Sequence, residues 1–160
     1  MDIDGGPPQD IADATEYGAS WNADGTILFL PTPHSPISRV PASGGQPATV
    51  VRLDPPRRTS HGLPHFLPDG RHFLFVVGGT EEGLYLGSLD GDEPKRLSTN
   101  RWSAEYLPPG FVLTQRMGAL VAQKLDLQRG ALTGDPITLA SPVDFRSPFF
   151  DGFSVTLMAS

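Results

Sequence analysis

The residues best suited to chemistry in this chain are its four histidines. His61 and His65 have the i, i+4 spacing that brings two metal ligands together on a helix. Gly62 lies between them, and Pro64 also favours an extended segment over a helix. No sequence landmark supplies a third and a fourth ligand. We therefore predict no metal site and no cofactor, and we expect the other two histidines on loops or the solvent face: His34 and His72.

Serine and aspartate candidates for catalysis are better explained by structure. A serine hydrolase of the common type carries Gly-x-Ser-x-Gly on a tight turn, and the segment Gly18-Ala19-Ser20-Trp21-Asn22 matches only its first half. We expect this segment to be the first strand of a sheet, with Trp21 packed between sheets. Three aspartates recur at repeated positions where turn chemistry accounts for them: Asp24, Asp69 and Asp90. The sequence predicts that this chain is not an enzyme.

The elements that carry these residues must be short. The chain holds 18 glycines and 17 prolines among 160 residues, roughly twice the usual combined frequency. The longest segment free of both, Lys95 to Leu107, has 13 residues, whereas a helical bundle needs several helices of at least that length. Apolar residues make up 38% of the chain, enough to form a core rather than a disordered chain. The composition predicts short strands joined by frequent turns.

Two landmarks repeat along the chain. An aromatic residue precedes a turn and an apolar run at Trp21 to Gly25, at Phe66 to Gly70 and, without its Asp, at Tyr106 to Gly110. The motif Gly-x-x-Pro occurs at Gly5 to Pro8, Gly44 to Pro47 and Gly91 to Pro94, with a weaker copy at Thr133 to Pro136. The turn glycines are 45 and 40 residues apart, and the prolines 39, 47 and 42. This period is the length of one four-stranded propeller blade.

Each repeat predicts four strands. The second repeat gives them at Gly62 to Phe66, Arg71 to Val77, Leu84 to Leu89 and Lys95 to Ser98. The first repeat gives them from Gly18, then at Thr26 to Leu30, Ile37 to Pro41 and Ala48 to Leu53. The third gives them at Trp102 to Leu107, Phe111 to Thr114, Leu120 to Asp126 and Ile137 to Ala140. In each, the turn after the aromatic residue joins the first two strands, because Asp and Gly favour tight turns.

One segment has a competing tendency, since Met117 to Gln128 is rich in helix-favouring residues. Its Leu125-Asp126 aligns with Leu89-Asp90 of the preceding repeat. We therefore predict a strand there, with sheet pairing overriding local propensity.

The predicted fold class is all-β: a partial β-propeller of about three four-stranded antiparallel blades, plus incomplete blades at both ends. The complete blades span 18–54, 61–99 and 101–141. Residues 1–17 are expected to end a preceding blade, with an outer strand at Gln9 to Ala12, and residues 142–160 to begin the next one. Propellers close with about four to eight blades. We therefore expect a piece of a longer propeller, a truncated reading frame, or a chain completed by self-association through open sheet edges.

With these landmarks the chain resembles the WD40-like repeats of the TolB-type β-propeller family, over about residues 5 to 141. Four further segments resemble the propeller that follows the kinase domain in bacterial receptor-type serine/threonine protein kinases: Gly5 to Gln9, Gly18 to Asn22, Val40 to Gly45 and Leu132 to Pro136. The resemblance implies a noncatalytic module for protein or peptide interaction, or for sensing, in a larger signalling protein. No kinase motif is present, since Asp151-Gly152-Phe153 has the wrong order for Asp-Phe-Gly.

Two other interpretations stay open. The chain is alternatively the substrate-gating propeller of a prolyl-oligopeptidase-like serine hydrolase whose catalytic domain lies elsewhere, or a truncated frame without a function of its own. The flanking reading frame distinguishes these, because kinase motifs and a membrane span support the first interpretation and Gly-x-Ser-x-Gly supports the hydrolase.

Charge and loop composition limit the partners. Twelve basic and 18 acidic residues give a net charge of −6, and the basic residues form no stripe, so nucleic acid is not expected. The longest apolar run, Phe73 to Val77, is far too short to cross a membrane. We expect a bacterial parent protein, with this segment either cytoplasmic or extracytoplasmic. Since Arg and Trp are enriched at binding hot spots, the candidate contacts for a protein or peptide partner are Arg57, Arg58 and Trp102.

Overall fold

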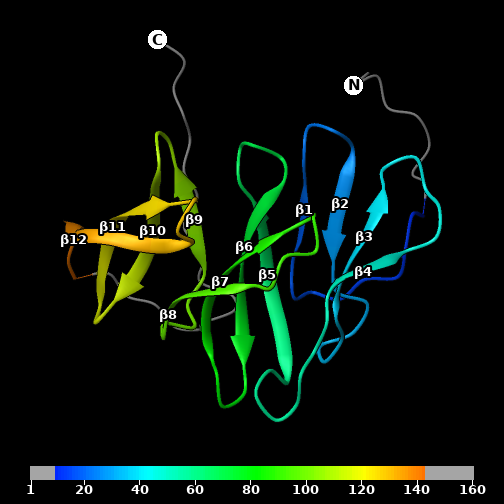
Figure 1. The fold of residues 1–160 in the computed structure, drawn as a ribbon, viewed down its shortest axis with the longest axis horizontal. Helices are drawn as coiled ribbons and strands as arrows, with labels where there is room; N and C mark the ends of the chain where they lie inside the picture. Colours follow the sequence, from blue (N-terminus) through cyan, green and yellow to red (C-terminus); the bar gives the residue numbers. More distant parts are fainter. Residues whose placement is uncertain (1–9, 143–160) are drawn as a thin grey trace.

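The computed structural model describes residues 10–142, and all regular structure in this range is β-strand (Figure 1). The twelve strands are β1 (Ala19–Trp21), β2 (Thr26–Phe29), β3 (Ile37–Pro41), β4 (Ala48–Val51), β5 (Ser60–Phe66), β6 (His72–Gly78), β7 (Gly83–Ser88), β8 (Lys95–Ser98), β9 (Ala104–Leu107), β10 (Phe111–Arg116), β11 (Ala119–Asp126) and β12 (Ala131–Ala140). They form three antiparallel four-stranded sheets, each from four consecutive strands. The predicted all-β class is confirmed, and within residues 10–142 no helix is capable of spanning a membrane.

The second sheet lies between the other two (Figure 1). Its strand β6 is buried on both faces: Phe73, Phe75 and Val77 face the first sheet, while Leu74 and Val76 face the third. The first sheet contributes Leu28, Ile37 and Val51, and the third contributes Ala104, Val112 and Leu125. Because alternate side chains of a strand point to opposite faces, this one apolar run builds both inter-sheet cores.

The turn after each repeated aromatic residue has the same backbone hydrogen bond. The N–H groups of Gly25, Gly70 and Gly110 donate to the carbonyls of Asn22, Leu67 and Leu107 at 3.1, 3.0 and 3.1 Å. In the second sheet, Asp69 Oδ1 also accepts the backbone N–H groups of Arg71 and His72, each at 2.9 Å. Gly70 has a φ of 69°, which a glycine adopts without steric cost. The turn role predicted for this landmark is confirmed.

The third sheet departs from the predicted layout. The segment Met117 to Gln128 contains strand β11, as predicted. The last strand, predicted to begin at Ile137, instead begins at Ala131 and runs through the motif copy at Thr133 to Pro136. Leu132 already pairs with Leu125, and a shift in register follows between Ala122 and Lys124. This bulge accommodates Pro136, which has no N–H to give to the sheet.

The predicted outer strand at Gln9 to Ala12 is also wrong for residues 10–12, which carry no strand assignment. Residue 9, the first Gly-x-x-Pro copy and the expected strand start after residue 142 lie outside the described residues. Residues 10–18 form the approach to β1. Within it, the backbone N–H of Thr15 donates to the carbonyl oxygen of Leu30 at 3.0 Å.

Trp21 is not packed between sheets, which corrects the expectation for β1. It is 53% exposed, whereas Phe66, its counterpart in the repeat, is 7% exposed and packs between the first and second sheets. The neighbouring Ser20 faces the second sheet, because its Oγ accepts the backbone N–H of Phe66 at 2.9 Å. Side chains alternate along a strand, so Trp21 points to the opposite, uncovered face of the first sheet.

Candidate functional site

Connecting segments of the first and second sheets gather at one end of the molecule, on the lower side of Figure 1, and enclose a pocket of about 270 Å³. Its walls come from the approach to β1, the β2–β3 loop, the β4–β5 link, the β6–β7 turn and the β8–β9 link. Its polar lining consists of Tyr17, His34, Thr59, Ser60, His61 and Arg101. We call this the His61 pocket.

The β4–β5 link, one wall of the His61 pocket, is fixed by backbone hydrogen bonds. Asp54 and Arg58 exchange N–H to O bonds of 3.0 and 2.9 Å, and Glu81 N–H donates to Arg57 O at 3.0 Å. Gly79 follows β6 with a φ of 126°, and a Cβ there would overlap the carbonyl oxygen of Arg57. Only glycine permits this close approach, which holds the β4–β5 link against the β6–β7 turn.

His61 is the most unusual residue of the pocket. It is 3% exposed, and its ring meets Phe75 edge to face with centroids 5.4 Å apart. Both ring nitrogens are buried and have no hydrogen-bond partner. Burial, together with the nearby Arg58 cation, lowers the pKa of His61 to about 4, so the ring is neutral at pH 7 and offers one donor and one acceptor. Most buried polar groups are paired, and leaving one unpaired costs about 1–3 kcal/mol.

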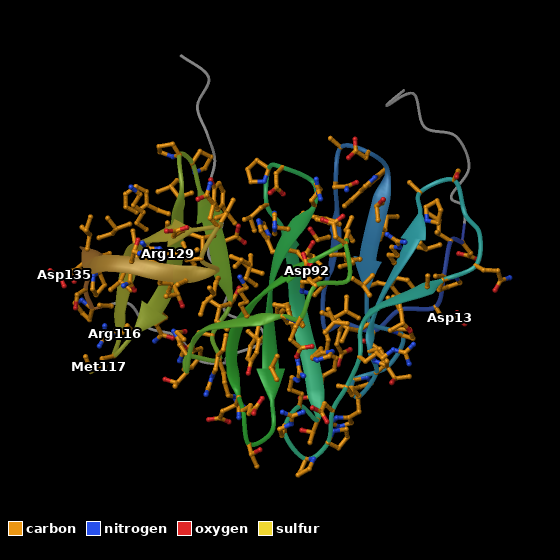
Figure 2. The ribbon with its side chains drawn as sticks, in the orientation of Figure 1. Asp13, Asp92, Arg116, Met117, Arg129 and Asp135 are labelled. Atoms are coloured by element: carbon orange, nitrogen blue, oxygen red, sulfur yellow. The ribbon has the colours of Figure 1, made fainter. Side chains whose placement is uncertain are left out.

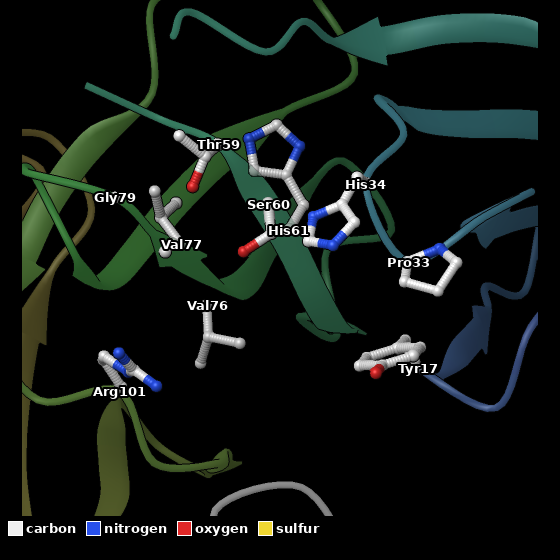
Figure 3. Close-up of a pocket in the computed structure, with 11 residues that line it drawn as sticks. Tyr17, Pro33, His34, Thr59, Ser60, His61, Val76, Val77, Gly79 and Arg101 are labelled. Carbon is white, nitrogen blue, oxygen red and sulfur yellow. The ribbon is translucent and has the colours of Figure 1, made fainter. Parts of the chain in front are cut away.

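The other polar side chains around the pocket carry hydroxyls, an imidazole and a guanidinium (Figure 3). Arg101 pairs with Glu82 at 2.8 Å, but both side chains are nearly half exposed, and a guanidinium has five N–H groups. Among the described residues, no hydrogen bond joins the hydroxyl of Thr59 or Ser60 to an imidazole of this pocket. The pocket therefore presents hydroxyl, imidazole and guanidinium groups.

The structure separates the three residues predicted to contact a partner. Arg57 and Arg58 both lie on the β4–β5 link, whereas Trp102 lines a different pocket beside the third sheet. Arg58 is buried and donates to Glu93 Oε1 at 2.7 Å, and its Nη2 lies 3.6 Å from Asp54 Oδ2. Burial opposes the charge of Arg58, but the hydrogen bonds and charges of Glu93 and Asp54 raise its pKa on balance. Arg58 thus joins the link to the β7–β8 turn, while Arg57 is largely exposed.

The two histidines with i, i+4 spacing, His61 and His65, are also separated. The strand β5 carries both residues, but its pairing with β6 shifts register between Gly62 and His65. His65 Nε2 lies 3.4 Å from Glu105 Oε2 in a different pocket, which is lined by Trp21 and Tyr106. Within the part of the chain that the structure describes, no group of three or more His, Cys, Asp or Glu side chains is placed to hold a metal.

Sequence reasoning noticed His61 for its spacing alone and missed Tyr17 and Arg101. Tyr17 and Arg101 come from connections 84 positions apart in the printed sequence, and no motif marks either one. The burial of His61 depends on Phe75 of the neighbouring strand, which a single-sequence pattern does not reveal.

Comparisons with known proteins show the fold. No protein-family model matches the chain, and no curated protein does. Among solved structures, the crystal structure of TolB from Acinetobacter baumannii is similar with a TM-score of 0.52 and 21% sequence identity. The match covers 71% of this chain and 30% of that chain. The three sheets therefore have the fold of β-propeller blades, like those of TolB, and the chain spans less than a third of that protein's length.

Proposed function

We propose that this chain is a noncatalytic segment of a β-propeller that binds a peptide or protein, with the His61 pocket as its recognition site. The observation that carries the proposal is His61, a residue of the pocket lining whose two ring nitrogens are buried and unpartnered. A group that folding leaves unpaired is satisfied when a ligand supplies the missing hydrogen bond. Binding residues commonly lie on loops held by a rigid scaffold, and the bonded β4–β5 link fits this description.

We further propose that the parent is a larger bacterial signalling protein, such as a receptor-type serine/threonine kinase. The support is the resemblance of Val40 to Gly45 and of the other quoted segments to the propellers of such kinases. The full coding sequence is the test: kinase motifs and a membrane span beside this segment support the proposal. A downstream Gly-x-Ser-x-Gly would instead support the substrate-gating propeller of a serine hydrolase.

The binding function is tested with an array of random short synthetic peptides. The variants are His61→Phe, which keeps the aromatic packing on Phe75 but removes both nitrogens, and the control His72→Phe at the opposite end of the second sheet. Peptides selected by the wild-type chain should bind His61→Phe about tenfold or more weakly, because a lost buried hydrogen bond costs about 1–3 kcal/mol. Binding to His72→Phe should be unchanged. Selected peptides that bind both variants like the wild type would contradict the proposal.

A further inference from the structure

We propose that the segment 143–160 packs on the face of the third sheet that points away from the second sheet, over strands β10 and β11. We call this surface the outer face of the third sheet and define it by Leu113, Gln115, Leu120 and Ala122. The proposal concerns a different part of the molecule from the His61 pocket and does not depend on the proposed binding function.

The register of the third sheet places these four residues on one face. Val112 packs in the cluster between the second and third sheets, so its neighbour Leu113 on β10 points the other way. Leu113 pairs directly with Ala122 of β11. Gln115, two residues after Leu113, pairs with Leu120. Because directly paired residues lie on the same side of a sheet, all four side chains point away from the second sheet.

The outer face is buried over β10 and β11 although no described sheet covers it. The third sheet ends the row of three sheets that residues 10–142 form (Figure 1). Yet Leu113 is 5% exposed, Gln115 8% and Ala122 4%, and neither cluster between two sheets includes Leu113 or Ala122. Ile137 on β12, the direct partner of Ala122, is 54% exposed. The covering element therefore lies over β10 and β11 and leaves β12 in solvent.

The composition of the segment 143–160 fits this position. Phe149 to Gly152 repeats the turn landmark in a shortened form, and its glycine follows Gly110 by 42 residues, within the spacings of the earlier copies. Apolar residues then alternate with hydroxyl residues from Phe153 to Leu157, the pattern of a strand with one buried face. Two strands joined by a turn would cover two strands of the third sheet, β10 and β11, and not β12.

The two described repeats that follow a sheet show how such a segment packs. Phe66, before the turn of the second repeat, packs in the cluster shared with the first sheet. Tyr106, before the turn of the third repeat, packs against the cluster shared with the second sheet. In both repeats the aromatic residue before the turn faces the preceding sheet. Phe149 and Phe150 hold the corresponding place in the segment 143–160, and the sheet that precedes them is the third.

The experiment places the photoreactive residue benzoylphenylalanine at Phe149, Phe150 and Phe153, one position at a time, in the full chain. This residue keeps an aromatic ring and on irradiation bonds to a C–H group in contact with it. We expect at least one of the three positions to cross-link, within the same chain, to the peptide that carries Leu113 or Ala122, as mapped by mass spectrometry. Cross-links confined to other sheets would overturn the proposal. Cross-links only to the third sheet of a second copy, seen with mixed isotope-labelled and unlabelled chains, would overturn it as well.

Thiol protection is a second measurement. The chain has no cysteine, so Ala122→Cys puts a single thiol on the outer face. The control Ala104→Cys puts one on the opposite face of the same sheet, where Ala104 is 6% exposed in the cluster with the second sheet.

Changing Phe149, Phe150 and Phe153 together to Ser should raise the alkylation rate of Ala122→Cys about tenfold or more, because a thiol reacts only when it is exposed. The Ala104→Cys thiol should stay protected. An Ala122→Cys thiol that reacts equally slowly with and without the three phenylalanines would overturn the proposal. The cross-linking experiment keeps an aromatic ring at every position, so it decides the question even where the serine variant does not fold.

Discussion

The side chain of Asn22 donates a hydrogen bond from Nδ2 to the backbone carbonyl of Gly70 at 2.7 Å. This bond joins the β1–β2 turn of the first sheet to the β5–β6 turn of the second, 48 residues further along the chain. The Oδ1 atom of Asn22 accepts the backbone N–H of Thr26 at 2.8 Å. One buried amide thus fixes its own turn and the spacing between two blades.

Replacing Asn22 should therefore weaken the whole chain. Asn22→Ala leaves the Gly70 carbonyl and the Thr26 N–H without this partner, which should lower the free energy of unfolding by about 1–3 kcal/mol. Urea unfolding followed by circular dichroism measures this change. The control Asp13→Ala changes an exposed residue and should shift the free energy by no more than about 0.5 kcal/mol. Equal effects of the two changes would contradict the role of Asn22.

The neutral state of His61 should make stability depend on pH. The pKa of His61 is about 4 in the folded chain and about 6.5 when unfolded. The unfolded state therefore binds more protons between these values, and stability is lost as pH falls from about 6.5 to about 4. At pH 5 the loss due to this residue should be about 2 kcal/mol.

Comparing thermal or urea unfolding of the wild type and His61→Phe at pH 7 and pH 5 isolates this contribution, because the other titrating groups are common to both proteins. His61→Phe should be at least as stable as the wild type at pH 7, since it removes an unpaired buried polar group. A variant that loses as much stability at pH 5 as the wild type would show that His61 is not the titrating group.

The two arginines of the β4–β5 link should differ in their effects. Arg58→Ala removes a buried guanidinium that contacts Glu93 and Asp54, and should cost about 1–3 kcal/mol; this is less than for a fully buried pair because Glu93 is mostly exposed. Arg57→Ala should change stability by no more than about 0.5 kcal/mol, because its pairs with Asp54 and Glu81 lie at the surface. Urea unfolding would contradict this assignment if Arg57→Ala were the more destabilising change.

Position 87 on β7 has no room for a side chain, because the rings of Phe73 and Phe75 on β6 pack against Gly87. A Cβ at this position would lie 2.6 Å from two ring carbons of Phe73 and 3.2 Å from one of Phe75. Gly87→Ala should therefore destabilise the chain by about 1–3 kcal/mol through overpacking. Gly91→Ala is a useful comparison, because a Cβ added at Gly91 would have no atom within 4 Å. Only the positive φ of 84° opposes this change, and it should lower the free energy of unfolding by about 1–2 kcal/mol. A Gly87 variant with wild-type stability in urea would contradict this packing.

The isolated chain should self-associate through its outer sheets. Trp21 on the first sheet and Ile137 and Leu139 on β12 are each more than half exposed, and Met117 projects at the β10–β11 turn (Figure 2). Exposed apolar faces and strand edges favour association. Sedimentation velocity should show a mass above 17.2 kDa that rises with concentration, and Trp21→Ser should reduce it. A compact monomer at every concentration would refute this expectation.

Much of the fold was predictable because each repeat contains residues with strong local preferences for turns and strands. The Pro68-Asp69-Gly70 turn forms from the backbone preferences of its own residues, and the alternation along β6 follows from strand geometry. The prediction was wrong at Pro136, where the pairing of Leu132 with Leu125 continued the strand through a turn motif. Local motifs fail where partners in the sheet offer more hydrogen bonds than the turn does.

The sequence by itself determined the order and approximate bounds of most strands in the three sheets, since turns and alternation act over a few residues. Only the tertiary structure decided that Arg58 is buried against Glu93 and that Trp21 is exposed. It also decided that His61 is buried and unpaired and that Tyr17 and Arg101 line the same pocket. The physical reason is that burial and hydrogen-bond pairing depend on which distant segments the sheets bring into contact, and no local pattern encodes those contacts.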